Sequence, residues 1–169
     1  TPKPSSAASD VYKRQGKATV ADVLRSISAN TGNANNETTN NGWASGSASI
    51  GLRGLSPKNT LVLLNGRRVA NYGFPAGGLS DTFVDLNALP LVAVERIEVL
   101  KDGASAVYGS DAVAGVVNII TRQNFEGAEI GGSFGGADQG GLREQNLKFV
   151  GGLGDLDSDG YNILFSLQG

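Results

Sequence analysis

The sequence predicts an α+β fold, in which a domain of short strands and short helices is followed by longer antiparallel β-strands. Three observations support this prediction: a helical period near the N-terminus, a series of short apolar runs between turn residues, and a change to two-residue alternation after Arg122. Gly is the most frequent residue, with 25 copies, and charged residues make up 18% of the chain. This composition favours turns and close backbone contacts over a helical bundle.

The helix is predicted over residues 19–29. Its apolar residues recur at the spacing of one helical face, at Val20, Val23, Leu24 and Ile27. Thr19 and Asp22 have the spacing of a capping box at its start. Residues 30–46 are rich in Asn, Thr and Gly and predict a long loop after the helix.

Short strands are predicted where apolar runs are bounded by Gly, Pro, Asn or Asp, at residues 48–52, 60–64, 94–100 and 116–121. The Asn65-Gly66 pair predicts a tight hairpin after the second strand. A second long loop is expected at residues 71–83. The small residues at 105–114 favour a short helical turn around Tyr108.

After Arg122, three segments of about 9 to 10 residues alternate apolar and polar or Gly positions, as transmembrane β-strands do. Ile130 and Phe134, Leu147 and Phe149, and Phe165 and Leu167 mark the apolar positions. An ordinary soluble meander has the same alternation, so the period alone leaves both alternatives open.

The chain contains no His and no Cys, which removes imidazole and thiolate ligands, disulfides and the common nucleophile systems. We therefore expect no enzyme, no catalytic residues, no cofactor and no metal; a carboxylate pair is the formal alternative. The net charge of −2, without blocks of like charge, gives no footprint for nucleic acid. Residues 1–15 have no apolar signal region and are expected to be a tail or an artefact.

The acidic segment at residues 155–160 resembles part of a metal-binding motif. Asp155, Asp157, Asp159 and Gly160 match the opening of an EF-hand calcium loop, but its twelfth position is Ser166 instead of a bidentate Glu. A polar turn between two strands explains the same residues, so we do not expect calcium there.

Two segments carry a resemblance to a known family. IGLRGLSPKNTLVLLNGRRV (residues 50–69) and DLNALPLVAVERIEVLKDGASAVYGSDAVAGVVNIITR (residues 85–122) resemble the two signature segments of the TonB-dependent receptor plug domain. The first resembles its Arg-Gly segment and Leu-Val-Leu-x-Asn-Gly hairpin. The second resembles its Glu-Arg-Ile-Glu-Val, Tyr-Gly and Gly-Val-x-Asn-Ile-x-Thr run.

The resemblance implies that residues 16–122 form a mixed-sheet plug and that residues 123–169 are the first three strands of an incomplete β-barrel. It implies an active transporter of the bacterial outer membrane. Such a transporter binds a scarce ligand, such as a siderophore-like iron complex, a vitamin or an oligosaccharide, and imports it with TonB energy. The implied partners are the inner-membrane TonB complex, the remaining barrel, the small-molecule ligand and outer-membrane lipid. Residues 1–18 contain no convincing TonB box.

The resemblance also implies roles for individual residues. The two long loops would contact the ligand through Trp43, Asn71, Tyr72, Phe74 and Asp81, although each aromatic side chain could instead hold its loop on the core. The fold and ion-pair positions are Arg53, Gly54, Asn65, Gly66, Arg67, Glu95, Arg96, Glu98, Gly103, Tyr108, Gly109, Gly115 and Asn118. Strand alternation predicts Glu95 and Glu98 on opposite faces.

The alternative function is a soluble β-rich binding or adhesion module, which would fold as a monomer without detergent. Against it, an open sheet that exposes Ile130, Phe149, Phe165 and Leu167 to water would aggregate.

Overall fold

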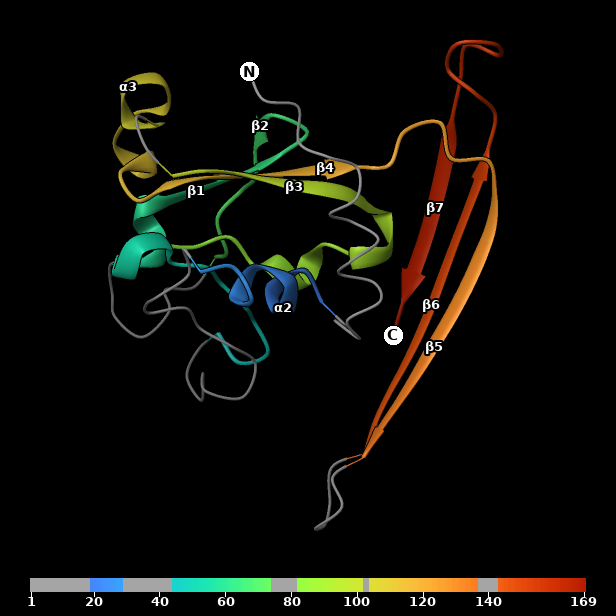
Figure 1. Ribbon diagram of the computed structural model, residues 1–169, viewed down its shortest axis with the longest axis horizontal. Helices are drawn as coiled ribbons and strands as arrows, with labels where there is room; N and C mark the ends of the chain where they lie inside the picture. Colours follow the sequence, from blue (N-terminus) through green and yellow to red (C-terminus); the bar gives the residue numbers. More distant parts are fainter. Residues whose placement is uncertain (1–18, 29–43, 74–81, 102–103, 137–142) are drawn as a thin grey trace.

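The computed structural model describes residues 19–28, 44–73, 82–101, 104–136 and 143–169, whose strands form two sheets (Figure 1). The strands are β1 (Thr60–Leu64), β2 (Arg67–Arg68), β3 (Val94–Leu100), β4 (Gly115–Thr121), β5 (Gly127–Gly136), β6 (Arg143–Leu153) and β7 (Ile163–Gln168). The α-helices are α2 (Val20–Arg25) and α3 (Ala104–Tyr108). The 3₁₀ helices are η1 (Leu52–Gly54), η2 (Pro57–Asn59), η3 (Leu86–Ala88), η4 (Leu91–Ala93) and η5 (Ser110–Ala112). No helix in these residue ranges is long and apolar enough to cross a membrane.

The first sheet has four strands in the order β2-β1-β4-β3. Strand β1 runs parallel to β4, with Thr60 opposite Gly115 and Leu64 opposite Ile119, whereas β2 and β3 run antiparallel to their neighbours. The first four residues of β1 are buried, as expected for a parallel strand covered on both faces. A mixed sheet with short helices, followed by antiparallel strands, confirms the predicted fold class.

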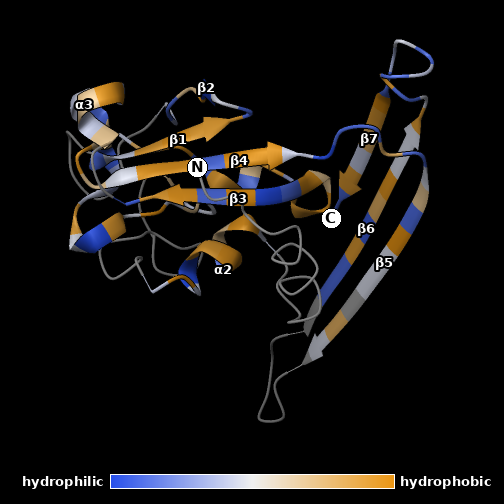
Figure 2. Cartoon of the chain, turned by 45° about the horizontal axis from the view of Figure 1, so that its top comes forward, coloured by the Kyte–Doolittle hydropathy of each residue, from blue (hydrophilic) through white to orange (hydrophobic). Residues whose placement is uncertain are grey.

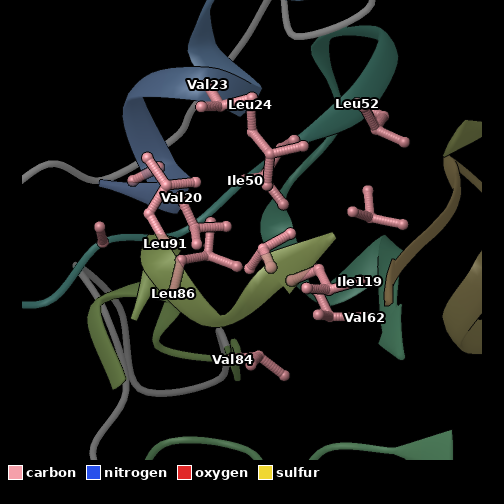
Figure 3. Close-up of a cluster of buried hydrophobic side chains, with 14 of the residues drawn as sticks. Val20, Val23, Leu24, Ile50, Leu52, Val62, Val84, Leu86, Leu91 and Ile119 are labelled. Atoms are coloured by element: carbon pink, nitrogen blue, oxygen red, sulfur yellow. The ribbon is translucent and has the colours of Figure 1, made fainter. Parts of the chain in front are cut away.

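The main core lies between one face of this sheet and helix α2. Figure 3 shows Val20 of α2 close to Leu86 and Leu91, and Leu24 of α2 close to Ile50; Ile119 of the sheet belongs to the same cluster. On the opposite face, a smaller cluster joins α3 and η5 to β1 and β4; its buried members are Leu61, Leu63, Ala104, Ala112 and Val116. The sheet is therefore the central layer of the first domain.

Helix α2 begins with the predicted capping box. The Thr19 hydroxyl accepts a hydrogen bond from the Asp22 N–H at 3.1 Å, and the Asp22 carboxylate accepts one from the Thr19 N–H at 3.2 Å. The helix ends at Arg25, four residues before the predicted end, with Ser26 as its C-cap. Ile27 still packs against the core, because the predicted apolar spacing continues beyond the helix into the next turn.

The Asn65-Gly66 hairpin and the short helix around Tyr108 were both predicted correctly. Asn65 and Gly66 have φ values of 51° and 77°, the two positive values that a type I′ turn requires. Helix α3 ends at Tyr108.

The predicted strand at residues 48–52 is wrong, although Ala48 and Leu52 are buried. Two of its backbone N–H groups donate to side chains: Ala48 donates to Asp85 Oδ1 at 3.0 Å, and Leu52 donates to Thr60 Oγ1 at 3.1 Å. These two backbone N–H groups are thus satisfied without a neighbouring strand, and η1 follows directly.

The second sheet is an antiparallel meander in the order β5-β6-β7, and it stands beside the end of the mixed sheet (Figure 1). Its strands contain 10, 11 and 6 residues, so β7 is shorter than predicted. Figure 2 shows apolar and polar bands alternating along these strands. Ile130 is 78% exposed and Phe134 is 85% exposed on one face, whereas Val150 on the other face is fully buried where β6 meets η4. The meander is therefore two-faced, with an apolar outer face.

Candidate functional site

A polar network crosses the mixed sheet at the residues of the second motif. Arg96 Nε donates to Glu98 Oε1 at 2.9 Å, and Arg96 Nη1 donates to Glu95 Oε1 at 2.8 Å. Asn118, opposite Glu98 on β4, donates from Nδ2 to Glu98 Oε2 at 3.3 Å. The Asn118 Oδ1 atom accepts a hydrogen bond from the Gly66 N–H at 2.9 Å. The network therefore connects edge strand β3, across β4, to the hairpin turn.

Strand alternation predicts Glu95 and Glu98 on opposite faces, and the resemblance implies that they form ion pairs. Both carboxylates contact the guanidinium of Arg96. The pairing of β3 with β4 is irregular between Val94 and Arg96, so strict two-residue alternation does not hold at Glu95. Hydrogen bonding to Glu98, and then to Glu95, raises the pKa of Arg96 above its ordinary value.

The hairpin turn is fixed to β4 by the side chain of Asn65. Its Oδ1 atom accepts the Thr121 N–H at 2.9 Å, and its Nδ2 donates to Thr121 Oγ1 at 2.9 Å. Next to the turn, Arg67 is exposed. Arg68 forms an ion pair with Asp111 at 2.6 Å and also donates to the Tyr108 carbonyl oxygen. These contacts attach the hairpin to both β4 and the helices on the second face.

The Arg53-Gly54 pair lies in a sharp turn within η1, where both residues have positive φ values of 57° and 73°. Arg53 Nη1 donates to the Lys101 carbonyl oxygen at 3.3 Å, at the end of β3. Gly109 also has a positive φ, of 91°, directly after α3. Gly103 lies outside the described residues.

Gly115 is positioned by close packing. A Cβ atom placed on it would lie 2.6 Å from the Leu100 carbonyl oxygen and 2.9 Å from Leu52 Cδ1. Its φ of 138° is a further restriction to glycine. The start of β4 therefore approaches the end of β3 more closely than any side chain would allow.

The base of the second predicted ligand loop is ordered around one aromatic pair. The rings of Tyr72 and Phe83 stack with centroids 5.3 Å apart, and the Tyr72 N–H donates to the Phe83 carbonyl oxygen at 2.7 Å. Phe83 is buried and contacts Ala44, whereas Asn71 is exposed. Trp43, Phe74 and Asp81 lie outside the described residues. Of the five predicted ligand contacts, the structure thus describes Asn71 and Tyr72.

The acidic turn at residues 155–160 is held by hydrogen bonds from its own backbone N–H groups to its aspartate side chains. Asp155 Oδ1 accepts hydrogen bonds from the N–H groups of Asp157 at 2.7 Å and Ser158 at 3.0 Å. Asp159 Oδ2 accepts one from the Asp155 N–H at 3.1 Å. These bonds account for the Asp residues as turn-forming groups between β6 and β7.

Contacts between the two sheets were not predicted from the sequence. The guanidinium of Arg122 pairs with Glu129 of β5 at 3.2 Å and lies over the ring of Phe125, 5.0 Å from its centroid. No local pattern identifies these partners, because the chain must turn between β4 and β5 to bring them together. The functional polar groups of the described chain thus hold strands and sheets to one another, an arrangement suited to a structural or binding role.

Comparison with known proteins identifies the family. The family model of the TonB-dependent Receptor Plug Domain matches residues 1–116. The ferric enterobactin receptor PirA of Pseudomonas aeruginosa is 38% identical over 123 residues, which cover 69% of this chain and 16% of that receptor. The chain therefore spans about a sixth of the length of this curated relative.

Two solved structures are similar as well. A mutant of the ferric enterobactin receptor PfeA from Pseudomonas aeruginosa, in complex with enterobactin, aligns with a TM-score of 0.61 and 30% identity, covering 85% of this chain and 21% of that chain. The unliganded ferric citrate transporter FecA aligns with a TM-score of 0.65 and 25% identity, covering 90% and 23%. The chain belongs to the TonB-dependent receptor plug family, whose members are transport proteins of the bacterial outer membrane and not enzymes.

Proposed function

We propose that this chain is the plug and the start of the barrel of a receptor that imports an iron–siderophore complex with energy from the TonB complex. The observation that carries the proposal is the two-faced meander β5–β7, whose buried face packs against the mixed-sheet domain. A plug inside a membrane barrel needs this arrangement, with polar and plug-contacting residues inside and apolar residues outside.

The apolar outer face supports a lipid environment over the soluble alternative. Its exposed members on β5–β7 are Ile130, Phe134, Leu147, Leu153, Ile163, Phe165 and Leu167. Cross-strand pairing brings several of them into one surface, since Ile130 lies opposite Phe149 and Phe149 lies opposite Leu167. Large contiguous apolar surfaces are uncommon on soluble monomers and mark membrane or protein contacts. Outer-membrane lipid and the remaining barrel strands are the proposed partners of this face.

An iron–siderophore complex is the ligand class best supported by the relatives. The similar receptors PirA and PfeA are named ferric enterobactin receptors, and FecA is named a ferric citrate transporter. We assign the ligand contacts to the two loops that carry Trp43, Asn71, Tyr72, Phe74 and Asp81. The stacked Tyr72–Phe83 pair gives the second loop a rigid aromatic base, which suits stacking on an aromatic ligand.

Iron uptake by the full-length receptor tests this function. The receptor is produced in a bacterium that lacks its own siderophore receptors, and cell-associated radioactive iron is measured with ferric enterobactin or ferric citrate. We expect uptake of at least one complex when TonB is present and surface binding alone when TonB is deleted. A receptor that binds neither complex, or a full-length protein that folds in water without detergent, would contradict the proposal.

The ligand site is tested by Tyr72→Ala, with Tyr161→Ala as the matched control. Tyr161 is 55% exposed and lies in the turn between β6 and β7, away from the predicted loops. We expect Tyr72→Ala to weaken ligand binding by roughly tenfold, as for the loss of one stacking contact, and Tyr161→Ala to leave it unchanged. Equal affinity in both variants would remove Tyr72 from the ligand site.

A further inference from the structure

The linker at residues 122–126 joins β4 of the plug sheet to β5 of the meander (Figure 1). Such a connection between two sheets is commonly a mobile hinge. Here, however, its residues contact β5, β6 and the turn between β6 and β7, through an ion pair, a close backbone approach and side-chain hydrogen bonds.

Arg122 holds the first end of the linker. Its backbone N–H donates to the Ala93 carbonyl oxygen at 2.9 Å, which attaches it to η4. Its side chain is only 10% exposed, and it reaches Glu129 of β5 while it lies over the ring of Phe125. A desolvated guanidinium between a carboxylate and an aromatic face is more strongly held than an exposed ion pair.

Phe125 holds the other end by a close approach to β6. A Cβ atom on Gly152 would overlap the Phe125 carbonyl oxygen and would lie 2.8 Å from Phe125 Cδ1. Gly152 pairs with Gly127 of β5 and Leu164 of β7, so it lies in the middle of the meander. The linker therefore runs directly over the backbone of β6, where only glycine leaves room.

Two asparagine side chains complete these contacts at the turn between β6 and β7. Asn124 Oδ1 accepts a hydrogen bond from the Leu156 N–H at 3.0 Å. Asn162 Nδ2 donates to the Phe125 carbonyl oxygen at 3.3 Å and also contacts the Gly154 carbonyl oxygen. Strands β5 and β6 and the turn between β6 and β7 thus each contribute at least one contact to the linker.

We propose that residues 122–126 form an anchor that fixes β4 to the first barrel strands, so that plug movement during transport leaves this end in place. The proposal goes beyond the transport function given above and rests on it. Arg122 and Asn162 are positioning residues in this anchor, because their contacts hold the linker and the meander in place. Any path that opens for the ligand would then form away from the β5–β7 sector of the wall.

Hydrogen exchange of the full-length receptor tests the anchor without any transport step. In wild type, the Leu156 amide should be protected, and Asn124→Ala should accelerate its exchange about fivefold by removing its acceptor. The Asp159 amide, which donates to the Asp155 carbonyl oxygen within the same turn, is the internal reference and should not change. An unprotected Leu156 amide in wild type would overturn the proposal.

Leakage through the receptor tests whether the anchor holds the plug. In a TonB-deficient strain, growth is measured against a large antibiotic that does not cross an intact outer membrane. Arg122→Glu should lower the inhibitory concentration several-fold, and Arg122→Glu combined with Glu129→Arg should recover part of the loss. Arg25→Ala, which removes the ion pair with Asp22 inside α2, is the matched control and should behave as wild type.

The amount of folded receptor in the outer membrane is measured for every variant. If Arg122→Glu does not accumulate there, Arg122→Lys and Asn162→Ala carry the same test, since each removes one part of the anchor and adds no opposing charge. The anchor would be refuted if the Arg122 and Asn162 variants excluded the antibiotic as well as wild type does and if Asn124→Ala left the exchange rate of the Leu156 amide unchanged. A receptor with a protected Leu156 amide but no iron uptake would instead refute the proposed function.

Discussion

Replacing Gly115 with alanine should open the mixed sheet where β3 and β4 begin their pairing. The new Cβ atom would lie 2.6 Å from the Leu100 carbonyl oxygen and 2.9 Å from Leu52 Cδ1. The Leu52 side chain can shift, but the Leu100 carbonyl belongs to the backbone of β3, which pairs with Val116 beside the substitution. The change therefore combines a strained backbone with a steric overlap that the sheet cannot easily relieve.

The two effects have comparable magnitudes. A side chain at a φ of 138° costs about 1–3 kcal/mol. Overpacking of a tight site costs about 1–3 kcal/mol more. The sum of about 2–6 kcal/mol is a large part of the 5–15 kcal/mol that holds a typical domain folded.

Hydrogen exchange at the β4 amides in the full-length receptor measures this loss. Because about 1.4 kcal/mol corresponds to a factor of ten, we expect exchange at Val116 and Val117 to accelerate at least about 25-fold. Gly66→Ala is the matched control, since Gly66 has a φ of 77° but nothing within 4 Å of its Cβ position. If both variants accelerate exchange equally, the close approach to Leu100 contributes nothing and the steric argument is wrong.

Three further predictions address the core, the polar network and the outer face. Leu24→Ala should lower plug stability by about 2–5 kcal/mol because Leu24 is fully buried, whereas Leu55→Ala, at a 39% exposed side chain, should cost less; exchange of core amides measures both. Arg96→Met should destabilise the sheet by about 1 kcal/mol by leaving two adjacent carboxylates without their shared partner, and high salt should reduce the loss. Because the pKa of Arg96 is raised, Arg96 stays charged from mildly acidic to mildly alkaline pH, and its titration does not change the stability of the wild-type sheet in that range. A loss of wild-type stability in that range that is traced to deprotonation of Arg96 would contradict this. Ile130→Lys should cost about 2–4 kcal/mol in the lipid-facing sheet and lower the folded receptor in outer-membrane fractions, whereas Asp157→Lys in the exposed turn should not; equal levels would argue against lipid contact.

The Ile130→Lys variant also distinguishes a membrane receptor from the alternative of a soluble module. In water, a lysine at Ile130 would improve solubility, because it would interrupt an exposed apolar surface. In a membrane it would destabilise insertion. The sign of the effect on folded protein therefore distinguishes the two environments.

Local sequence patterns were sufficient for the elements whose partners are near in the chain. Thr19 and Asp22 specified the start of α2, because a capping box needs only residues three apart. Asn65-Gly66 specified the β1–β2 turn, because both positive φ values are a property of that dipeptide. The two-residue alternation after Arg122 likewise specified the β5–β7 strands. The motif resemblance supplied the family, which the comparisons confirmed.

The tertiary structure decided the features that depend on distant partners. Residues 48–52 are buried like a strand, but they are not in one, and the Ala48 and Leu52 N–H groups bond to the side chains of Asp85 and Thr60 instead. The ion pairs of Arg96 lie next to a register shift against β4, and the contacts of Arg122 depend on how two sheets meet. Apolar spacing indicates which face of an element is buried, but it does not indicate which distant backbone group or side chain will contact that element. For that reason the sequence by itself determined the family of this protein and the elements with partners near in the chain, and only the folded chain determined the network, the close approach at Gly115 and the contacts of the linker.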